Sequence, residues 1–167
     1  MMPRSLKELH VQEYTSLVTG SITEKCVARV APDIDRSRAT FMQGDACALP
    51  EELGRFDAVL AANLLCRLPQ PHVFLQRCEQ LVKPGGVLVL VSPYSWLEQY
   101  TPREHWLGGD YDENGQVKDS AKTVASLLSN RFTLVEEEDM PFLMREHVRK
   151  YAIGVSHGTV WRRNSEE

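Results

Sequence analysis

Alternating runs of apolar and polar residues predict a strand, a helix and a second strand near the middle of the chain. Phe56 to Ala62 and Val87 to Val91 are nearly continuous in apolar residues, as strands covered on both faces would be. Between them, apolar residues recur at helical spacing from about Pro71 to Val82, and Lys83-Pro84-Gly85-Gly86 ends this helix. The order predicts two parallel neighbouring strands joined by a crossover helix.

Further apolar segments extend this α/β pattern in both directions. Ala39 to Gln43 predicts a strand that ends at Gly44-Asp45, and Ser120 to Leu128 predicts a second helix. Phe132 to Val135 begins another strand. Tyr151 to Trp161 alternates large and small residues with period two, which predicts an antiparallel strand near the edge of the sheet.

The first 37 residues carry a weak pattern. Leu6, Leu9 and Val11 fit a helix remnant, and Thr23 to Val30 fits another short helix. We therefore expect an irregular or helical segment over residues 1–37, the sheet-containing part over residues 38–163 and a tail over residues 164–167.

Composition and charge favour an ordinary globular domain. The 167 residues are 43% apolar and 25% charged, with a net charge of −4, so nothing indicates a nucleic-acid surface. No apolar run approaches the roughly 20 residues of a membrane span. Arg4, Lys7 and Glu8 stand where a signal peptide would need apolar residues. We expect a cytoplasmic protein with neither a membrane nor a nucleic acid as partner.

The spacing of cysteine and histidine residues predicts no metal site. None of the four cysteines forms a Cys-x-x-Cys pair, and the histidines lack His-x-x-x-His spacing. We expect reduced thiols that mostly fill the core.

Two short segments follow predicted strands, where ligands bind in open α/β sheets. In the first, Asp45, with Ala46 and Cys47 beside it, could accept a hydrogen bond from an exocyclic amine such as that of adenine; the alternative is a simple turn. In the second, Asn63 and Leu64 follow the Phe56–Ala62 strand, where Asn63 would present an amide at the mouth of the sheet or cap a helix.

Two longer segments carry candidate substrate contacts. Residues 92–109 gather aromatic and charged side chains whose flat rings suit a planar ligand and whose Arg103 suits a carboxylate, and the candidates are Tyr94, Trp96, Arg103, Glu104 and Trp106. The alternative is a small core beneath a long loop. Residues 139–147, including Arg145, join the last two strands and could close over the same cleft; the alternative is a plain connection with Arg145 and Glu146 paired at the surface.

These motifs, taken in order, resemble the second half of class I S-adenosylmethionine-dependent methyltransferases. More specifically, they resemble the C-terminal 4-mercaptohistidine N1-methyltransferase domain of ovothiol synthases over about residues 27–163. The matching segments are Gly44-Asp45-Ala46, Phe56 to Leu60, Ala61 to Pro69, Leu81 to Gly86, Ser92 to Glu98, Thr101 to Glu104, Trp106 to Gly109 and Asp139 to Leu143.

The resemblance implies a Rossmann-like fold and methyl transfer from S-adenosylmethionine to a ring nitrogen of a thiol-substituted histidine. It implies that Asp45 lies at the adenine end of the cofactor and Asn63 near the methyl-transfer centre. Catalysis would then be mostly alignment of nitrogen, methyl and sulfur, with a carboxylate such as Glu104 orienting or deprotonating the ring.

The chain departs from the family pattern at its N-terminal end. It contains no Gly-x-Gly, whereas the family's first strand feeds a Gly-rich turn and its second ends in an acid that holds the ribose. The family's sheet order, 3-2-1-4-5-7-6, therefore implies an incomplete sheet without its first two strands and with open edges. We expect cofactor binding to need a missing N-terminal segment or a partner chain. The alternative function is a non-catalytic fragment that binds a partner through the aromatic loop.

Overall fold

The computed structural model describes residues 11–165, so the expected helix contributions of Leu6 and Leu9 lie outside the described residues. The chain divides into two units. One holds residues 45–142 and 154–167, and the other holds residues 1–44 and 143–153. Each unit is described by itself below.

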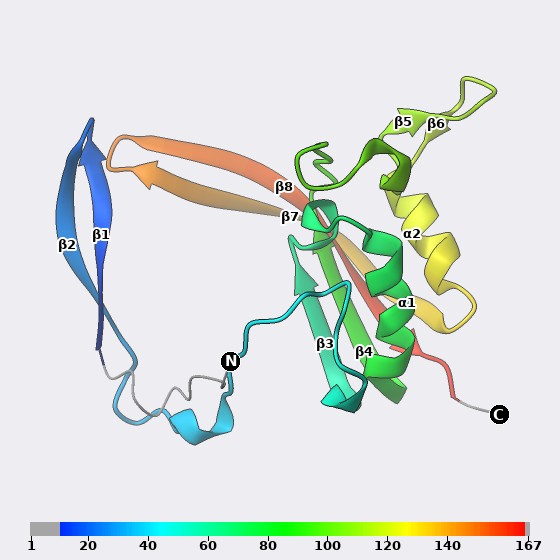
Figure 1. The fold of residues 1–167 in the computed structure, drawn as a ribbon, viewed down its shortest axis with the longest axis horizontal. Helices are drawn as coiled ribbons and strands as arrows, with labels where there is room; N and C mark the ends of the chain where they lie inside the picture. Colours follow the sequence, from blue (N-terminus) through cyan, green and yellow to red (C-terminus); the bar gives the residue numbers. More distant parts are fainter. Residues whose placement is uncertain (1–10, 166–167) are drawn as a thin grey trace. The chain divides into compact units, whose positions relative to one another are not determined.

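A four-stranded mixed sheet, in the order β3-β4-β8-β7, forms the centre of the fold (Figure 1). Its strands are β3 (Phe56–Ala62), β4 (Val82–Ser92), β7 (Phe132–His147) and β8 (Lys150–Arg163). β3 pairs with β4 in parallel, and β8 pairs with β4 antiparallel. Both predictions of strand direction are therefore confirmed, as is the α/β class.

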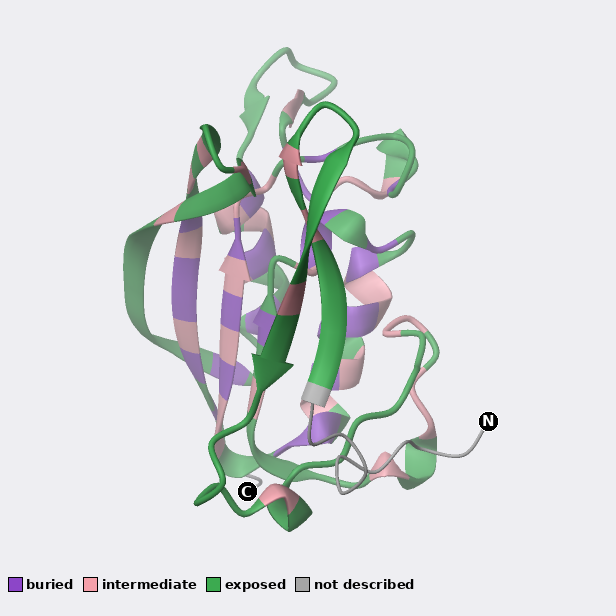
Figure 2. Cartoon of the chain, turned by 90° about the vertical axis from the view of Figure 1, so that its left-hand side faces the viewer, coloured by how far each residue is buried: buried purple, intermediate pink, exposed green. Residues whose placement is uncertain are grey.

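Two helices lie on the same face of this sheet (Figures 1 and 2). α1 (Pro71–Leu81) is the predicted crossover between β3 and β4, and proline at its first turn loses no helical hydrogen bond. α2 (Ser120–Leu128) begins after Asp119, whose carboxylate accepts the Lys122 N–H. Neither described helix is long and apolar enough to cross a membrane.

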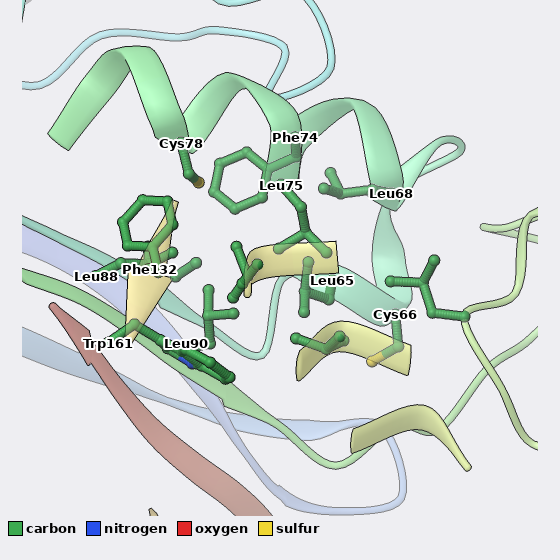
Figure 3. Packing of buried hydrophobic residues seen from close by; sticks show 14 of the residues in the cluster. Leu65, Cys66, Leu68, Phe74, Leu75, Cys78, Leu88, Leu90, Phe132 and Trp161 are labelled. Atoms are coloured by element: carbon green, nitrogen blue, oxygen red, sulfur yellow. The ribbon is translucent and has the colours of Figure 1, made fainter. Parts of the chain in front are cut away.

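The core lies between these helices and the sheet (Figure 3). Alternate β4 residues Leu88 and Leu90 point toward the helices, and their register partners on β8 are Trp161 and Thr159. The helices contribute apolar residues at helical spacing, so sheet and helices bury one another. Buried contributors include Phe74, Leu75, Cys78, Val124 and Leu128.

The alternation of large and small residues on β8 makes room for β7. A Cβ at Gly154 would lie 2.5 Å from the Phe142 ring, and one at Gly158 would lie 2.8 Å from Sδ of Met140. The prediction that residues 139–147 form a connection between strands is therefore wrong, because these residues are the second half of β7. Its side chains pack onto β8 as strand neighbours instead of forming a separate wall over a cleft.

The prediction of a strand over Ala39 to Gln43 is also wrong. Only Thr40 makes an isolated bridge, and Phe41 and Met42 remain 59% and 58% exposed. A strand is stable only where a neighbouring strand forms hydrogen bonds with its backbone N–H and C=O groups. An apolar sequence alone does not show whether such a neighbour is present.

Residues 11–29 form a hairpin, which corrects the helix expected over Thr23 to Val30 and the irregular or helical character expected for this part of residues 1–37. β1 (Val11–Thr19) pairs antiparallel with β2 (Ile22–Arg29). The turn is Gly20-Ser21, and Gly20 has a φ of +54° that glycine adopts at little cost. β2 contains the β-branched residues Ile22, Thr23 and Val27, which favour a strand.

The edge of β3 has no neighbouring strand among residues 11–165. Leu60 alternates along β3 with Ala61, which is buried in the core beneath the helices, so Leu60 lies on the opposite face, where it is 67% exposed. Because the Ala39–Gln43 strand is not formed, one open edge replaces the two inner edges that the family order implied.

Replacing Leu90 with alanine should lower the free energy of unfolding by about 2–5 kcal/mol, because it leaves a cavity in the core. The matched change Leu60→Ala removes the same atoms from an exposed position and should alter it by roughly 0.5 kcal/mol or less. Urea unfolding followed by circular dichroism measures both. Equal losses would mean that the Leu60 face is covered.

Candidate functional site

The parallel strands β3 and β4 end at the same edge of the sheet, and each is followed by a left-handed residue. Asn63 has a φ of +52° and Tyr94 a φ of +49°. They are the non-glycine residues with positive φ among those described. Such backbone costs of order 1–3 kcal/mol and clusters at functional sites. This edge is where open α/β sheets bind ligands.

Asn63 ties the end of β3 to both neighbouring elements. Its N–H donates to the Val91 carbonyl at 2.7 Å, and its Oδ1 accepts a hydrogen bond from Ser156 Oγ of β8 at 2.9 Å. The alternative of a helix cap does not hold, because the next helical turn, η4 (Leu65–Arg67), has Leu64 at its N-cap. The amide is therefore held at the mouth of the sheet.

Tyr94 begins a second set of polar contacts at the end of β4. Its N–H donates to Ser92 Oγ at 3.1 Å, and its hydroxyl lies 3.2 Å from His157 Nδ1. His157 Nε2 in turn lies 3.4 Å from Glu137 Oε2 of β7. Burial, followed by the nearby Asp119 and Glu137 carboxylates, raises the pKa of Tyr94 to about 12. The phenol therefore stays protonated near neutral pH.

Three residues of this arrangement, Ser156, His157 and Glu137, were missed by sequence reasoning. Ser92 pairs with His157 across β4 and β8, and this register brings the histidine beside Tyr94. The period-two alternation of β8 groups His157 with Thr159 and Trp161, but it carries no sign that Tyr94 lies opposite.

Asp45 closes a tight turn at the start of the sheet-containing unit. Its Oδ1 accepts the Cys47 N–H at 2.8 Å, and its carbonyl accepts the Ala48 N–H at 3.0 Å. Ala46, Cys47 and Leu64 are half-buried against the core. The turn alternative is thus correct in geometry, while the exposed carboxylate keeps further lone pairs to accept a hydrogen bond.

The aromatic loop is chiefly a small core, which corrects the assignment of Trp96 to a substrate. Trp96 is 7% exposed, and its Nε1 donates to Ser120 Oγ at 3.0 Å. Trp106 is half-buried and donates from Nε1 to the Thr101 carbonyl at 2.8 Å. Arg67, which sequence reasoning also missed, donates to the Ser95 carbonyl at 2.8 Å. The two indole rings form their hydrogen bonds within the protein, so they stabilise the loop by packing beneath it.

The remaining substrate candidates are exposed. Arg103 holds Asp110 through two hydrogen bonds, Nε to Oδ2 at 2.8 Å and Nη2 to Oδ1 at 3.1 Å. Glu104 is exposed on the turn η5 (Arg103–His105). Arg145 is exposed on the part of β7 that belongs to the other unit. There Glu146 pairs with Lys150, so the alternative Arg145–Glu146 pair is wrong.

The cysteines carry no disulfide in the structure, and burial raises the pKa of Cys78 to about 12. This thiol is therefore unreactive core filler. Within residues 11–165, no group of three or more His, Cys, Asp or Glu side chains is arranged to hold a metal ion.

Replacing Arg103 with glutamine should raise the pKa of Asp110, which hydrogen bonds from Arg103 lower from 3.8 to about 2. Because the folded-state pKa is depressed, the pair contributes stability above about pH 4 and loses it as the pH falls toward 2. Carbon-13 NMR of the Asp110 carboxyl measures the change. Lys83→Gln, which removes the partner of Asp57, is the control and should leave Asp110 unchanged. A wild-type midpoint near 4 would contradict the bidentate pair.

Comparison with known proteins identifies the fold at this point. Residues 4–90 match the family model for the methyltransferase domain. A SAM-dependent methyltransferase from Methanosarcina mazei is 19% identical, with a TM-score of 0.48 and coverage of 74% of this chain and 66% of that one. A protein studied for the conversion of a disulfide bond into a thioacetal group during echinomycin biosynthesis is 16% identical, with a TM-score of 0.50 and coverage of 74% and 55%.

This chain thus spans less than two thirds of the length of either solved structure. The sheet, with its parallel β3–β4 pair and antiparallel β8, has the Rossmann-like architecture of class I methyltransferases. Because the family model covers more than half of the residues, the chain belongs to the methyltransferase domain family.

Proposed function

We propose that the chain takes part in S-adenosylmethionine-dependent methyl transfer to a small molecule at the carboxyl ends of β3 and β4. The observation that carries the proposal is the pair of left-handed residues, Asn63 and Tyr94, that follow these two parallel strands. In a chain of this family, backbone strain at the ligand-binding edge of the sheet supports a site there.

The described residues suit one end of the cofactor. The exposed Asp45 carboxylate has lone pairs for an adenine amine, and Ala46, Cys47 and Leu64 offer half-buried surface nearby in the core packing. Asn63 stands at the strand end. No Gly-x-Gly turn follows any described strand, and β3 has no further neighbour among residues 11–165, so nothing comparable is present for the ribose and the amino-acid end.

For the acceptor, we propose a ring nitrogen of a thiol-substituted histidine, as the resemblance to ovothiol synthases implies. Trp106 and Tyr94 provide half-buried aromatic surface for an imidazole. A substrate carboxylate at Arg103 would have to compete with Asp110, which already occupies the guanidinium. Arg103 therefore binds the substrate only if that exchange takes place.

In this mechanism the bound cofactor supplies an activated methyl group. The chain's contribution is alignment, because an imidazole nitrogen is already nucleophilic. Asn63 is held rigidly by Val91 and Ser156, so its amide is suited to orient a ligand at the strand end. Glu104 remains a proposed group to orient the ring, since it is exposed on η5 beside Arg103.

Titration with S-adenosylhomocysteine tests the cofactor site. We expect amide signals of residues 45–47 and 63–64 to shift in proton–nitrogen NMR spectra, and only at high ligand concentration. Each hydrogen bond forgone costs about 0.5–1.5 kcal/mol, so losing three or four weakens affinity roughly 10²- to 10³-fold.

The shifts should disappear in Asp45→Ala and persist in Asp57→Ala, which changes an exposed carboxylate near the opposite end of β3. Absence of shifts at millimolar ligand would contradict the site. A micromolar dissociation constant would instead show that no further segment is needed.

A second candidate function is binding of another polypeptide along β3. It is favoured by the unpaired edge of β3 and by Leu60, which is 67% exposed, rather than by the aromatic loop, whose Trp96 is buried. The proposed occupant is a strand that adds to β3, since backbone pairing would satisfy its open groups.

If this is the function, the purified chain should self-associate with rising concentration, because an open apolar edge can pair with a copy. Leu60→Lys should restore the monomer in sedimentation velocity. Leu127→Lys, at a 41% exposed position on α2, should not. A chain that stays monomeric at every concentration would contradict edge pairing.

A further inference from the structure

Tyr94, His157 and Glu137 form a chain of polar contacts that the methyl-transfer proposal does not use. The three side chains come from the end of β4, from β8 and from β7. The Tyr94 hydroxyl lies 3.2 Å from His157 Nδ1, and His157 Nε2 lies 3.4 Å from Glu137 Oε2. His157 is 21% exposed and Glu137 is 60% exposed, so the chain leads from a half-buried phenol to solvent.

The Glu137 carboxylate sets the direction of hydrogen-bond donation along these three side chains. The Glu137 carboxylate, 3.4 Å from His157 Nε2, favours the tautomer in which Nε2 carries the proton and Nδ1 is left as an acceptor. The Tyr94 hydroxyl has a single proton and donates it to Nδ1. Its oxygen lone pairs then remain to accept a hydrogen bond from a ligand.

The backbone around Tyr94 holds the phenol in this position. Tyr94 is left-handed, and its N–H and carbonyl are both used, by Ser92 Oγ at 3.1 Å and by the Trp96 N–H at 3.0 Å. The register pair Ser92–His157 brings the histidine to the same strand end. Strain that the surroundings enforce at a ligand-binding edge is typical of a functional residue.

We infer that Tyr94, His157 and Glu137 form a proton relay serving a methyl acceptor that loses a proton when it is methylated. The inference rests on the proposed function. The acceptor would form a bond to the methyl carbon as the bond from that carbon to the sulfonium sulfur breaks, which releases the cofactor as the neutral thioether. The acceptor would then lose a proton from nitrogen, oxygen or sulfur to Tyr94 Oη. The phenol's own proton moves to His157 Nδ1. The resulting imidazolium is paired with Glu137 and later returns a proton to water.

A relay is needed at this position because burial raises the pKa of Tyr94 to about 12, so the phenol keeps its proton and can accept another only by passing its own on. Accepting one proton while donating another avoids a buried phenolate. Glu137 stabilises the transient positive charge on His157, as a carboxylate does for a catalytic imidazole. Tyr94 would touch the substrate, and His157 and Glu137 are positioning residues.

The first test does not depend on activity. Two-bond proton–nitrogen NMR of the full chain should show His157 with its proton on Nε2. Tyr94→Phe should move the Nδ1 signal, because the donated hydrogen bond is lost, and Glu137→Gln should mix the two tautomers. Tyr100→Phe, on the same loop beneath Arg67, is the matched control and should change neither. A proton on Nδ1, or an Nδ1 signal unchanged in Tyr94→Phe, would overturn the relay.

The second test compares two acceptors. An imidazole with an N–H loses a proton when methylated, whereas an N-methylimidazole does not. Tyr94→Phe and His157→Gln should lower kcat for the first by about 10²- to 10⁴-fold, with KM little changed, and leave the second nearly unaffected. The exposed Glu137→Gln, which is not expected to disturb folding, should give a smaller loss in the same direction. Equal losses on both acceptors would overturn the relay. No transfer to either by the wild-type chain would reject the proposed function, and the tautomer measurement would still decide the relay.

Discussion

Parallel pairing of β3 with β4 is the constraint on which the rest of the structure depends. Parallel neighbours cannot be joined by a tight turn, so the chain must cross over through α1, and α1 covers the helix-side face of both strands. The burial of Leu88 and Leu90 beneath it fixes which face points inward. Because both strands end at the same edge, Asn63 and Tyr94 are brought to one place with their backbones strained.

The aromatic loop after β4 shows how packing can take over residues that look suited to a ligand. Trp96 and Trp106 give their indole N–H groups to Ser120 and to the Thr101 carbonyl. Thr101 is itself fully buried and donates to the Leu68 carbonyl at 2.7 Å. A long loop cannot bury its backbone without such partners, so the aromatic side chains serve first to hold it. The side chains whose polar groups gather at the strand ends, Asn63, Tyr94, Ser156 and His157, form a separate polar set.

The open edge of β3 bears on ligand binding at the strand ends. β3 is apolar except for Asp57, and with Leu60 exposed it resembles an interior strand more than a protected edge. The same missing neighbour leaves one end of the cofactor without partners among the described residues. Under the proposed function, a strand that pairs with β3 would also add contacts for the cofactor, so cofactor affinity and edge pairing would be linked.

Sequence alone determined the elements whose patterns are local. A local pattern was enough to predict each of these elements: the apolar run for β3, helical spacing for α1 and α2, and alternation for β8. The strand directions followed from the crossover helix and from the alternation. It failed for Ala39 to Gln43 and for residues 23–30, where strand or helix depends on a pairing partner that short windows do not contain. The polar contacts at the strand ends could not be predicted from the sequence either. Ser156 meets Asn63 across 93 residues, and His157 meets Tyr94 across 63, because the β4–β8 register brings them together. Tertiary structure alone decided whether Trp96 faced a ligand or the core, since an indole satisfies its N–H equally well in either place.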